Sequence, residues 1–485
     1  MARRWIGIGA IVSIVVLIAA CDPQFPEGAT VQAEPLGPLV TLTWTDAIPI
    51  GQNDPVDHYG IEVDGTEVAV TTSTAATCVL TGLAPDTDYT LSVTAYSASG
   101  GWSGTYGQQD PEKENLSRVS TDYHTPAGGN AGSSMDCVPA TDSDGDRLPD
   151  AVETNDGNFV SAAQTGTDPA NADTDGDGID DGDEVLGTEA NLDLPAIGTS
   201  AVHKDILLEV DWMDDSSECA AHSHRPTAAI ETRAKDAFAN APITNPDGIT
   251  GVNLIMDYGQ GGALSGGNLV PDADGNIAGG VNGSEFAAIK AANFASNRDG
   301  YFHYVLDAHR YNSTSSSSGQ AEINGDDLVV TLYCYYGDTD AVANTIMHEL
   351  GHNLGLRHGG DEDTNYKWNY DSVMNYAYQF PGIDTDCDAS GDGVLTYSTG
   401  SRPQLDEFNL VEANGVCGPG TVALDWNGNG SIDAGTVAVD INGDGYGSTL
   451  HDYDDWANLN FGGTSDADRR PAPEVVTEQP VPDHG

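Results

Sequence analysis

The sequence predicts a multidomain protein in which an antiparallel β-sandwich precedes an α/β domain that is flanked by acidic loops. Short runs that alternate apolar and polar residues fill positions 30–106, as in a sandwich. Residues 200–415 instead alternate between strand-like and helix-like patterns. Two Asp-rich loops lie between these regions, and 485 residues are enough for two or three domains with ordinary cores.

The charge is strongly acidic, with 76 Asp and Glu against 17 Lys and Arg and a formal net charge of -59. Such a surface repels phosphate, so nucleic acid and anionic membrane surfaces are excluded as partners. Cations are the natural counterpart. Because much of the acidity lies in Asp/Gly/Asn runs, we expect bound calcium. A salt-rich habitat predicts a similar acidic excess.

Residues 1–20 have the pattern of an export signal, with Arg3 and Arg4 before an apolar run that is too short for a stable membrane span. The stretch from Leu17 to Cys21 resembles the bacterial lipobox, which implies cleavage before Cys21 and acylation of that cysteine. Simple secretion with an incidental Cys21 is the alternative. We therefore expect a lipid-anchored protein of the cell envelope or cell surface, or a secreted one, with the anchor as its sole membrane contact.

The six other cysteines are an even number, and export favours disulfides. Within the second half of the chain we expect Cys387 to pair with Cys417 and Cys219 with Cys334.

The segment 30–106 contains the run Leu83 to Tyr89, which resembles the tyrosine corner of fibronectin type III domains. Trp44 lies where those domains have an early core tryptophan. The resemblance implies a β-sandwich that serves as a spacer or binding module. Residues 107–141, rich in Gly, Ser, Pro and Asn, are predicted to be a linker. The strand-like runs are 39–44, 59–65, 77–83 and 88–97.

Two twelve-residue loops, 142–153 and 173–184, carry oxygen-bearing side chains at positions 1, 3, 5, 9 and 12, the spacing of a calcium loop. The second has Gly178 at the sharp-turn position, where the first has Arg147. A solvated acidic linker is the alternative, but its unneutralised carboxylates would repel each other. The loops resemble thrombospondin type 3 repeats, so we expect segment 142–199 to bind calcium and to stiffen the connection. The predicted ligands are Asp142, Asp144, Asp146, Asp150, Glu153, Asp173, Asp175, Asp177, Asp181 and Glu184.

A weaker form of the same pattern recurs in segment 416–462, at 425–433 and 440–448. These stretches lack an acid at position 12, where Thr436 and His451 stand. Asp386, Asp388 and Asp392 form a further candidate site. The Pro-, Glu- and Asp-rich tail 463–485 is predicted to be disordered.

Within 200–415, strands are expected at 204–213, 253–259 and 302–311, with an edge strand or hairpin over 318–332. A helix is expected at 227–240, and another should begin near Asp338 or Asp340, acids well placed to cap it.

On that second helix His348 and His352 are four residues apart, so both imidazoles project from one face and can bind the same metal ion. Glu349 is offset around the axis, where it can hold a water molecule without being a ligand. Gly355 allows a left-handed turn that returns His358 as the third nitrogen ligand. Three neutral histidines leave one zinc position open, as in a catalytic site.

The stretch HELGHNLGLRH (348–358) followed by SVMNY (372–376) resembles the zinc motif and Met-turn of the metzincin metalloproteases. The resemblance covers 200–415 and implies a metzincin catalytic domain, of a pappalysin-like, reprolysin-like or unassigned bacterial branch. It implies His348, His352 and His358 as zinc ligands and Glu349 as general base. Met374 would be the apolar floor beneath the metal, and the Tyr376 phenol would stabilise the oxyanion.

These observations predict an exported zinc metalloendopeptidase with zinc and calcium as cofactors. Its partner would be a protein or peptide substrate that adds as a strand to an edge within 318–332. The alternative is a calcium-stiffened surface adhesion protein with an inactive metzincin domain, against which the intact Glu349 argues.

Overall fold

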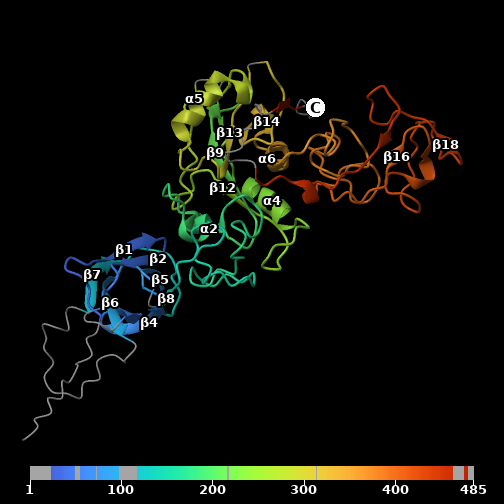
Figure 1. Ribbon diagram of the computed structural model, residues 1–485. Helices are drawn as coiled ribbons and strands as arrows, with labels where there is room; N and C mark the ends of the chain where they lie inside the picture. The colour runs from blue at the N-terminus through green and yellow to red at the C-terminus, as the bar shows by residue number, and fades with distance from the viewer. Residues whose placement is uncertain are drawn as a thin grey trace, which may run out of the picture. The chain divides into compact units, whose positions relative to one another are not determined.

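The computed structural model describes residues 23–49, 55–72, 74–97, 117–215, 218–272, 274–312, 314–462 and 474–478. The chain divides into two compact units, Met1–Thr141 and Asp142–Gly485 (Figure 1). The predicted export signal 1–20 and Cys21 lie outside the described residues. Among the residues described, no helix has both the length and the apolar character needed to cross a bilayer.

The first unit contains two antiparallel four-stranded sheets, as the alternating pattern predicts. One has the order β1-β2-β5-β8 and the other β4-β3-β6-β7. The strands are β1 (Val31–Leu36), β2 (Leu39–Trp44), β3 (Val56–Val63), β4 (Thr66–Thr72), β5 (Thr77–Thr81), β6 (Asp88–Ser97), β7 (Arg118–His124) and β8 (Asp136–Val138).

The tyrosine corner is present, because the backbone N–H of Ala84 donates to the hydroxyl of Tyr89 at 3.0 Å. Trp44 is buried and meets the ring of Tyr59 edge-on, with centroids 5.5 Å apart. Both observations agree with the resemblance noted in the sequence.

The predicted linker 107–141 is wrong over 118–124 and 136–138, which are strands β7 and β8. In β7 exposed and half-buried side chains alternate, so its composition resembles that of a loop. β8 is short and is joined to β5 by the disulfide between Cys137 and Cys78.

The second unit is built on a six-stranded sheet of order β12-β9-β13-β15-β14-β20. The first four strands are parallel, and β14 and β20 run antiparallel to their neighbours. The predicted strands and hairpin are confirmed as β9 (Asp205–Trp212), β12 (Asn253–Asp257), β13 (Phe302–Asp307), β14 (Gly319–Ile323) and β15 (Asp327–Val330). β10 (Asp214–Asp215) and β11 (His222–Ser223) form a separate small ribbon.

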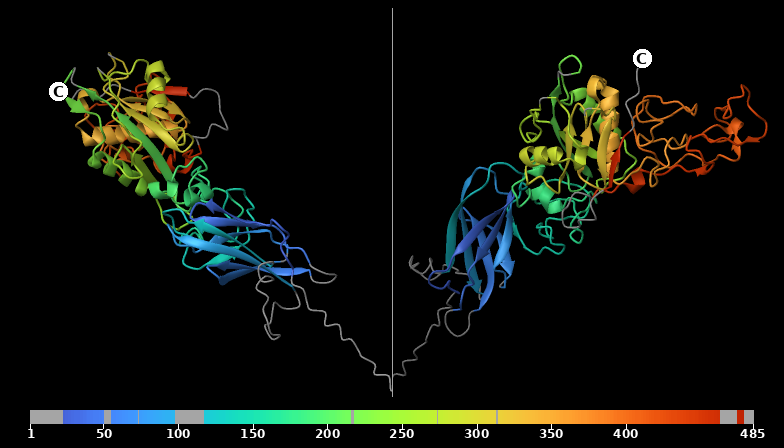
Figure 2. Two further views of the ribbon diagram at one scale, coloured as in Figure 1. Left: turned by 90° about the vertical axis from the view of Figure 1, so that its left-hand side faces the viewer. Right: turned by 90° about the horizontal axis from the view of Figure 1, so that it is seen from above.

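Helices cover both faces of this sheet (Figures 1 and 2). The two predicted helices, α4 (Ala228–Ala239) and α6 (Thr339–Asn353), pack together on one face against β9, β12 and β15. The other face packs against α5 (Ser284–Asn293), whose Phe286 meets the Tyr304 ring edge-on. Single 3-10 turns are η1 (Gly280–Asn282), η2 (Tyr333–Tyr335), η3 (Glu412–Asn414) and η4 (Trp456–Asn458).

The acidic segment 142–199 belongs to the same unit and not to a separate connector. Its short helices are α2 (Asp181–Leu186) and α3 (Leu194–Ile197). Leu194 and Ile197 bury their side chains against Leu207, Ile255 and Phe302 of the sheet. The segment is therefore part of the core of the second unit, which corrects the expectation of a stiffened connection.

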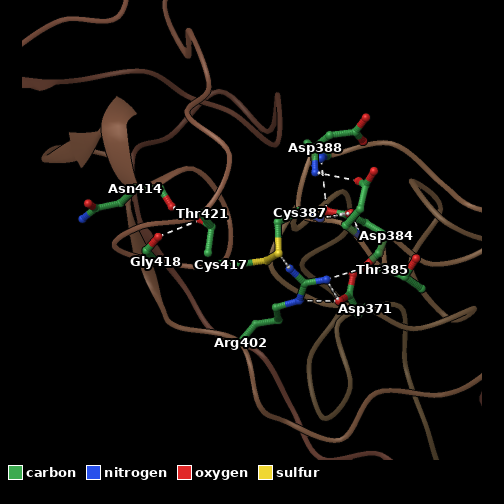
Figure 3. Close-up of a disulfide and its surroundings, with 12 residues drawn as sticks. Asp371, Asp384, Thr385, Cys387, Asp388, Arg402, Asn414, Cys417, Gly418 and Thr421 are labelled. Atoms are coloured by element: carbon green, nitrogen blue, oxygen red, sulfur yellow. Dashed lines mark hydrogen bonds and ion pairs between the residues drawn. A yellow bond between two sulfur atoms is a disulfide. The ribbon is translucent and has the colours of Figure 1, made fainter.

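The C-terminal loops are joined by two small ribbons, β16 (Leu405–Asp406) with β19 (Thr449–Leu450) and β17 (Leu410–Val411) with β18 (Thr436–Val437). The predicted disulfide Cys387–Cys417 is present (Figure 3), as is Cys219–Cys334. Beside Cys387, the Arg402 guanidinium pairs with Asp371 and donates to the backbone oxygen of Asp384.

The predicted disorder of the tail 463–485 is wrong over 474–478. Residues Glu474–Thr477 form β20, antiparallel to β14, with Ala321 opposite Val476. The run EVVT has strand-forming residues, and β14 provides the pairing edge. The composition of the tail did not predict this strand, because Pro, Asp and Glu residues surround the run.

Candidate metal centre

Helix α6 presents the first two histidines of the motif. Its N-cap is Asp338, whose carboxylate accepts from the backbone N–H groups of Asp340 and Ala341 at 3.0 and 3.1 Å, as predicted. His348 and His352 are fully buried, with ring centroids 5.0 Å apart. One helical turn therefore places both rings side by side, as the spacing of four residues requires.

The third histidine returns through a left-handed turn. Gly355 has φ +96° just beyond the helix, a conformation that glycine adopts without steric cost. The ring of His358 then lies 5.0 Å from that of His352 and 5.5 Å from that of His348. The structure thus brings together the three predicted ligands.

The hydrogen bonds of two of these rings fix their tautomer. Nδ1 of His348 lies 2.7 Å from the carbonyl oxygen of Val373, and Nδ1 of His352 lies 2.8 Å from that of Leu356. Because a carbonyl oxygen only accepts, each Nδ1 carries the hydrogen. In the neutral rings Nε2 then has a lone pair directed at the centre of the cluster, the arrangement of a metal-ligating histidine.

A fourth side chain, which the sequence analysis missed, lies at the centre of the triad. The carboxylate of Glu478, directly after β20, is 2.8 Å from Nε2 of His348, 3.1 Å from Nε2 of His352 and 3.2 Å from Nε2 of His358. Burial alone would raise the pKa of Glu478, but the three histidines lower it well below its usual range. The motif contains no signal for this residue.

These four residues form a group whose candidate ligand atoms all lie within 4.8 Å of one another. Two of the nitrogens are acceptors in the neutral rings, and a carboxylate is also an acceptor. Acceptors converge stably only around a cation or around added protons. The donor set of three imidazoles and one carboxylate fits a zinc ion.

Glu349 lies beside this group and faces the sheet. It is fully buried, and neither carboxyl oxygen has a hydrogen-bond partner among the described residues. Burial, and next the charge of Glu478, raise the pKa of Glu349 well above its usual range. A Cβ at Gly319 would overlap Oε1 of Glu349, so the carboxyl group contacts the backbone of strand β14.

Met374 and Tyr376 occupy the positions that the motif implies. Met374 is fully buried, and a Cβ at Gly351 would overlap its Sδ, so the thioether packs against α6 between the two helical histidines. The ring of Tyr376 lies with its centroid 4.3 Å from that of His358 and 5.9 Å from that of His348. The phenol is therefore adjacent to the triad.

The loop that carries these two residues is held in place by hydrogen bonds to the buried carboxylate of Asp455. The buried hydroxyl of Tyr370 donates to Oδ1 of Asp455 at 2.8 Å, and the backbone N–H of Ser398 donates to Oδ2 at 3.0 Å. Burial raises the pKa of Asp455 to about 7.

The first acidic loop, 142–153, directs some of its predicted ligands inward. Asp142, Asp144 and Asp146 group together, and Asp146 also groups with Glu153 and with Asp181 of the second loop. Burial raises the pKa of Glu153 to about 7. The carboxylates of the two loops are thus shared and do not form two independent cages.

Position 9 of each loop has a structural role. Asp150 accepts from the backbone N–H and the hydroxyl of Ser143, both at 2.8 Å. Asp181 accepts in the same way from Thr174, at 2.9 Å from the N–H and 2.6 Å from the hydroxyl. Gly178 has the predicted positive φ, +94°, and Arg147 adopts +83° at the matching position of the first loop.

The second loop forms a deeply buried acidic cluster. Burial and mutual repulsion raise the pKa of Asp175 to about 9 and that of Asp177 to about 7. Glu184 is buried beside them, and burial first, then repulsion from Asp177 and Asp175, raise its pKa well above the usual range. Asp205, the first residue of β9, joins this cluster and was missed, because it lies outside the twelve-residue window.

The C-terminal loops also obtain acids from outside their windows. Glu412 accepts from the backbone N–H of Asp433 at 2.7 Å, and Glu407 from that of Ile441 at 2.7 Å. Asp384 accepts from the backbone N–H of Cys387 at 2.6 Å, at the head of the stretch that contains Asp386. The predicted absence of a position-12 acid therefore does not deprive these loops of a buried carboxylate.

Comparison with known proteins assigns part of the chain. Residues 26–106 match the family model of the fibronectin type III domain. This segment is a fibronectin type III domain. No curated protein matches the chain.

Matches among solved structures are partial. The chain is similar to archaemetzincin from Methanopyrus kandleri, with 15% identity and a TM-score of 0.21 over 36% of this chain and 81% of that one. It is similar to the sixth fibronectin type III domain of human fibronectin type III domain containing protein 3, with 20% identity and a TM-score of 0.14 over 23% and 90%. The Clostridium perfringens spore cortex lytic enzyme SleM matches with 14% identity and a TM-score of 0.14 over 20% and 26%. The chain spans about a quarter of SleM, and TM-scores this low lend no weight to an assignment.

Proposed function

We propose that the chain is an exported zinc-dependent endopeptidase that cleaves proteins or peptides. The observation that supports this most is the convergence of three imidazoles, two of them held by carbonyls in the ligating tautomer. Beside them is the buried carboxyl group of Glu349, which has no hydrogen-bond partner among the described residues. A structural zinc site does not require such a carboxyl group, whereas hydrolysis requires a base.

The residues divide the work of hydrolysis. His348, His352 and His358 would hold zinc, which when bound supplies a Lewis acid that polarises the scissile carbonyl and acidifies water. Glu349 would take a proton from the attacking water and pass it to the leaving amine. Tyr376 would donate its phenol hydrogen to the oxygen that gains charge.

Substrate would lie along the sheet edge. Strand β14 is the last strand of the domain before the tail segment adds to it, and Glu349 contacts its first residue, Gly319. A peptide paired with β14 therefore has its backbone next to the proposed base.

The acidic loops would bind calcium, since their crowded buried carboxylates are otherwise left facing each other. The fibronectin type III domain fits an exported protein, and we propose a lipid anchor at Cys21 or free secretion as its location.

The test is Glu349→Ala, assayed by zymography and by cleavage of a quenched fluorescent peptide. Loss of the base should lower kcat by about 10²–10⁴-fold, while bound zinc, measured by mass spectrometry, is retained. Glu27→Ala, an exposed change in the fibronectin type III domain, serves as the control. Unchanged cleavage by Glu349→Ala would reject the assigned base.

A surface adhesion protein with an inactive zinc domain is the second candidate, and the fibronectin type III match favours it. The same zymogram distinguishes the two candidates, because an adhesion protein gives no cleared band with the wild type or with the Glu27→Ala control.

A further inference from the structure

A second cluster of histidines lies in the second unit and shares no residue with the triad. His222 is on β11, His224 follows it, and His309 comes two residues after β13. Their candidate ligand atoms lie within 4.8 Å of one another. The ring centroids are 4.7 Å apart for His222 and His224, 5.4 Å for His222 and His309, and 5.5 Å for His224 and His309.

Several buried ring nitrogens of this cluster have no hydrogen-bond partner among the described residues, unlike most buried polar groups. His224 is fully buried, and neither of its ring nitrogens has a hydrogen-bond partner among the described residues. Nδ1 of His222 lies 2.9 Å from the carbonyl oxygen of Ala220, which places the hydrogen there and leaves a lone pair on Nε2. That Nε2 is also buried and, within the described residues, without a partner.

The surroundings supply negative charge and rigidity. Oδ2 of the buried Asp215 lies 3.7 Å from Nδ1 of His309, and Oε2 of Glu218 lies 3.4 Å from its Nε2. The disulfide between Cys219 and Cys334 ties the loop of His222 to the segment before Tyr336, whose ring packs against His224. β9 and β13 are parallel neighbours, so the loops after both strands meet at one sheet edge.

We propose that His222, His224 and His309 bind a second divalent transition metal ion, of the class that prefers imidazole, with zinc the reference case. The buried carboxylate of Asp215 offsets the charge of the ion. The site holds together the two loops at this edge of the sheet. Packing of the three rings in the core without a metal does not account for the site, because buried ring nitrogens normally form hydrogen bonds.

The test measures metal binding at this site in a chain whose triad is disabled. The full exported chain carrying His348→Ala and His352→Ala is stripped of metal, saturated with calcium to fill the carboxylate sites, and titrated with Zn²⁺ by calorimetry. One equivalent should bind, and Co²⁺ should give the absorption bands of a nitrogen-ligated tetrahedral ion. Adding His224→Ala should remove both signals. Adding the exposed change His451→Ala should remove neither.

No zinc binding by the double variant with native near-UV circular dichroism would overturn the proposal. Should His224→Ala fail to fold, His222→Ala at the half-exposed position replaces it, and retention of the full equivalent by that variant counts against the site. Because the background variant lacks the triad, neither result depends on whether the protein is a peptidase.

A second inference comes from the tail segment and rests on the proposed function. β20 pairs antiparallel with β14, the edge proposed for substrate, and Val475 also packs into the core beneath β13. Ser317 donates its hydroxyl to the backbone oxygen of Glu478 at 2.7 Å, which fixes the end of the segment. The carboxylate of Glu478 then fills the space among the three histidines.

We infer that residues 474–478 are a built-in competitor of the substrate at β14. The segment is seated by backbone pairing, by the Val475 contact and by the Glu478 carboxylate, which would ligate the metal when it is bound. Arg357 pairs with Glu474 at the exposed end. We therefore expect this surface to accept peptides in which an acidic residue follows a short apolar strand.

The test measures binding and not turnover. In a Glu349→Ala background, a fluorescent peptide of residues 471–485 should bind a chain truncated after residue 463 and bind the full chain much more weakly. A peptide with Glu478→Ala should bind at least about tenfold more weakly, since a buried charged contact is lost. A Glu474→Ala peptide, which loses an exposed pair, should change by less than about fivefold.

Hydrogen exchange gives a second measurement. The β14 amides that face β20 should exchange faster in the truncated chain than in the full one. Equal peptide binding by both chains, or equal exchange, would overturn the inference even if the protein is a peptidase.

Discussion

The histidine triad and the acidic loops are both candidate cation sites, but different forces hold them in shape. The triad is rigid before any ion binds, because carbonyl oxygens hold His348 and His352 and the helix sets their spacing. The loops bring like charges together, and the pKa of Asp175 rises to about 9 through burial and repulsion. We therefore expect the loops to depend on their ion for stability, and the triad to depend on its ion for chemistry.

Calcium removal should have the largest effect on stability. One calcium site contributes about 2.7 kcal/mol when free calcium is a hundred times Kd, and the shared carboxylates couple the two loops, so both are destabilised when calcium is removed. Scanning calorimetry of protein depleted of calcium with EGTA and then reloaded with zinc should show a large fall in Tm that excess calcium reverses. Removal of zinc alone with phenanthroline should move Tm less. Equal shifts for both chelators would abolish the contrast between the two kinds of site.

Tyr376→Phe should affect chemistry and leave stability almost unchanged. Removing the phenol hydrogen takes away one donor to the developing oxyanion, which costs about 10²-fold in kcat. KM and bound zinc should stay constant, because the ring still packs on His358. The exposed Tyr446→Phe is the matched control. A fall in zinc content would instead assign Tyr376 to holding the site.

The effect of Asp181→Asn on the free energy of unfolding should change sign when calcium is removed, which sharpens the comparison further. Asp181 is fully buried and groups with Asp146 and Glu153 across the two loops. With calcium bound, loss of a ligand charge should lower the free energy of unfolding by about 2 kcal/mol. Without calcium and at a pH above about 8, the value to which burial raises the pKa of Asp181, the variant should be at least as stable as the wild type, since the repelling charge removed outweighs the one Thr174 hydrogen bond that the amide cannot accept. Urea titrations in calcium and in EGTA measure both arms, and the same sign in both would contradict the repulsion account.

The sequence predicted those parts of the sites whose residues are close along the chain. The spacing of His348 and His352, the turn at Gly355 and the cap at Asp338 are all set within one helix and its ends. The tyrosine corner at Tyr89 is equally local.

Residues joined by sheet topology were not predictable. Glu478 reaches the triad only because β20 pairs with β14, and no local pattern encodes that pairing. Asp205, Glu407 and Glu412 approach acidic loops from outside the twelve-residue windows. His222 and His309 meet because β9 and β13 are neighbours in the sheet.

The smallest expected effect concerns Asp455, which holds the loop of Met374 and Tyr376 in place. The pKa of Asp455 is about 7 in the folded protein because of its burial, against an ordinary value near 4. A carboxyl group with a raised folded pKa favours folding when protonated, so its contribution is complete below about pH 4 and falls until about pH 7. Asp455→Asn keeps an acceptor for the Tyr370 hydroxyl but does not titrate. In saturating calcium and zinc, the urea midpoint of the wild type should therefore decline more than that of the variant between pH 5 and pH 8. Parallel declines would show that Asp455 is already ionised in the folded protein, and that hydrogen bonds from neutral donors to a charged carboxylate hold the loop of Met374.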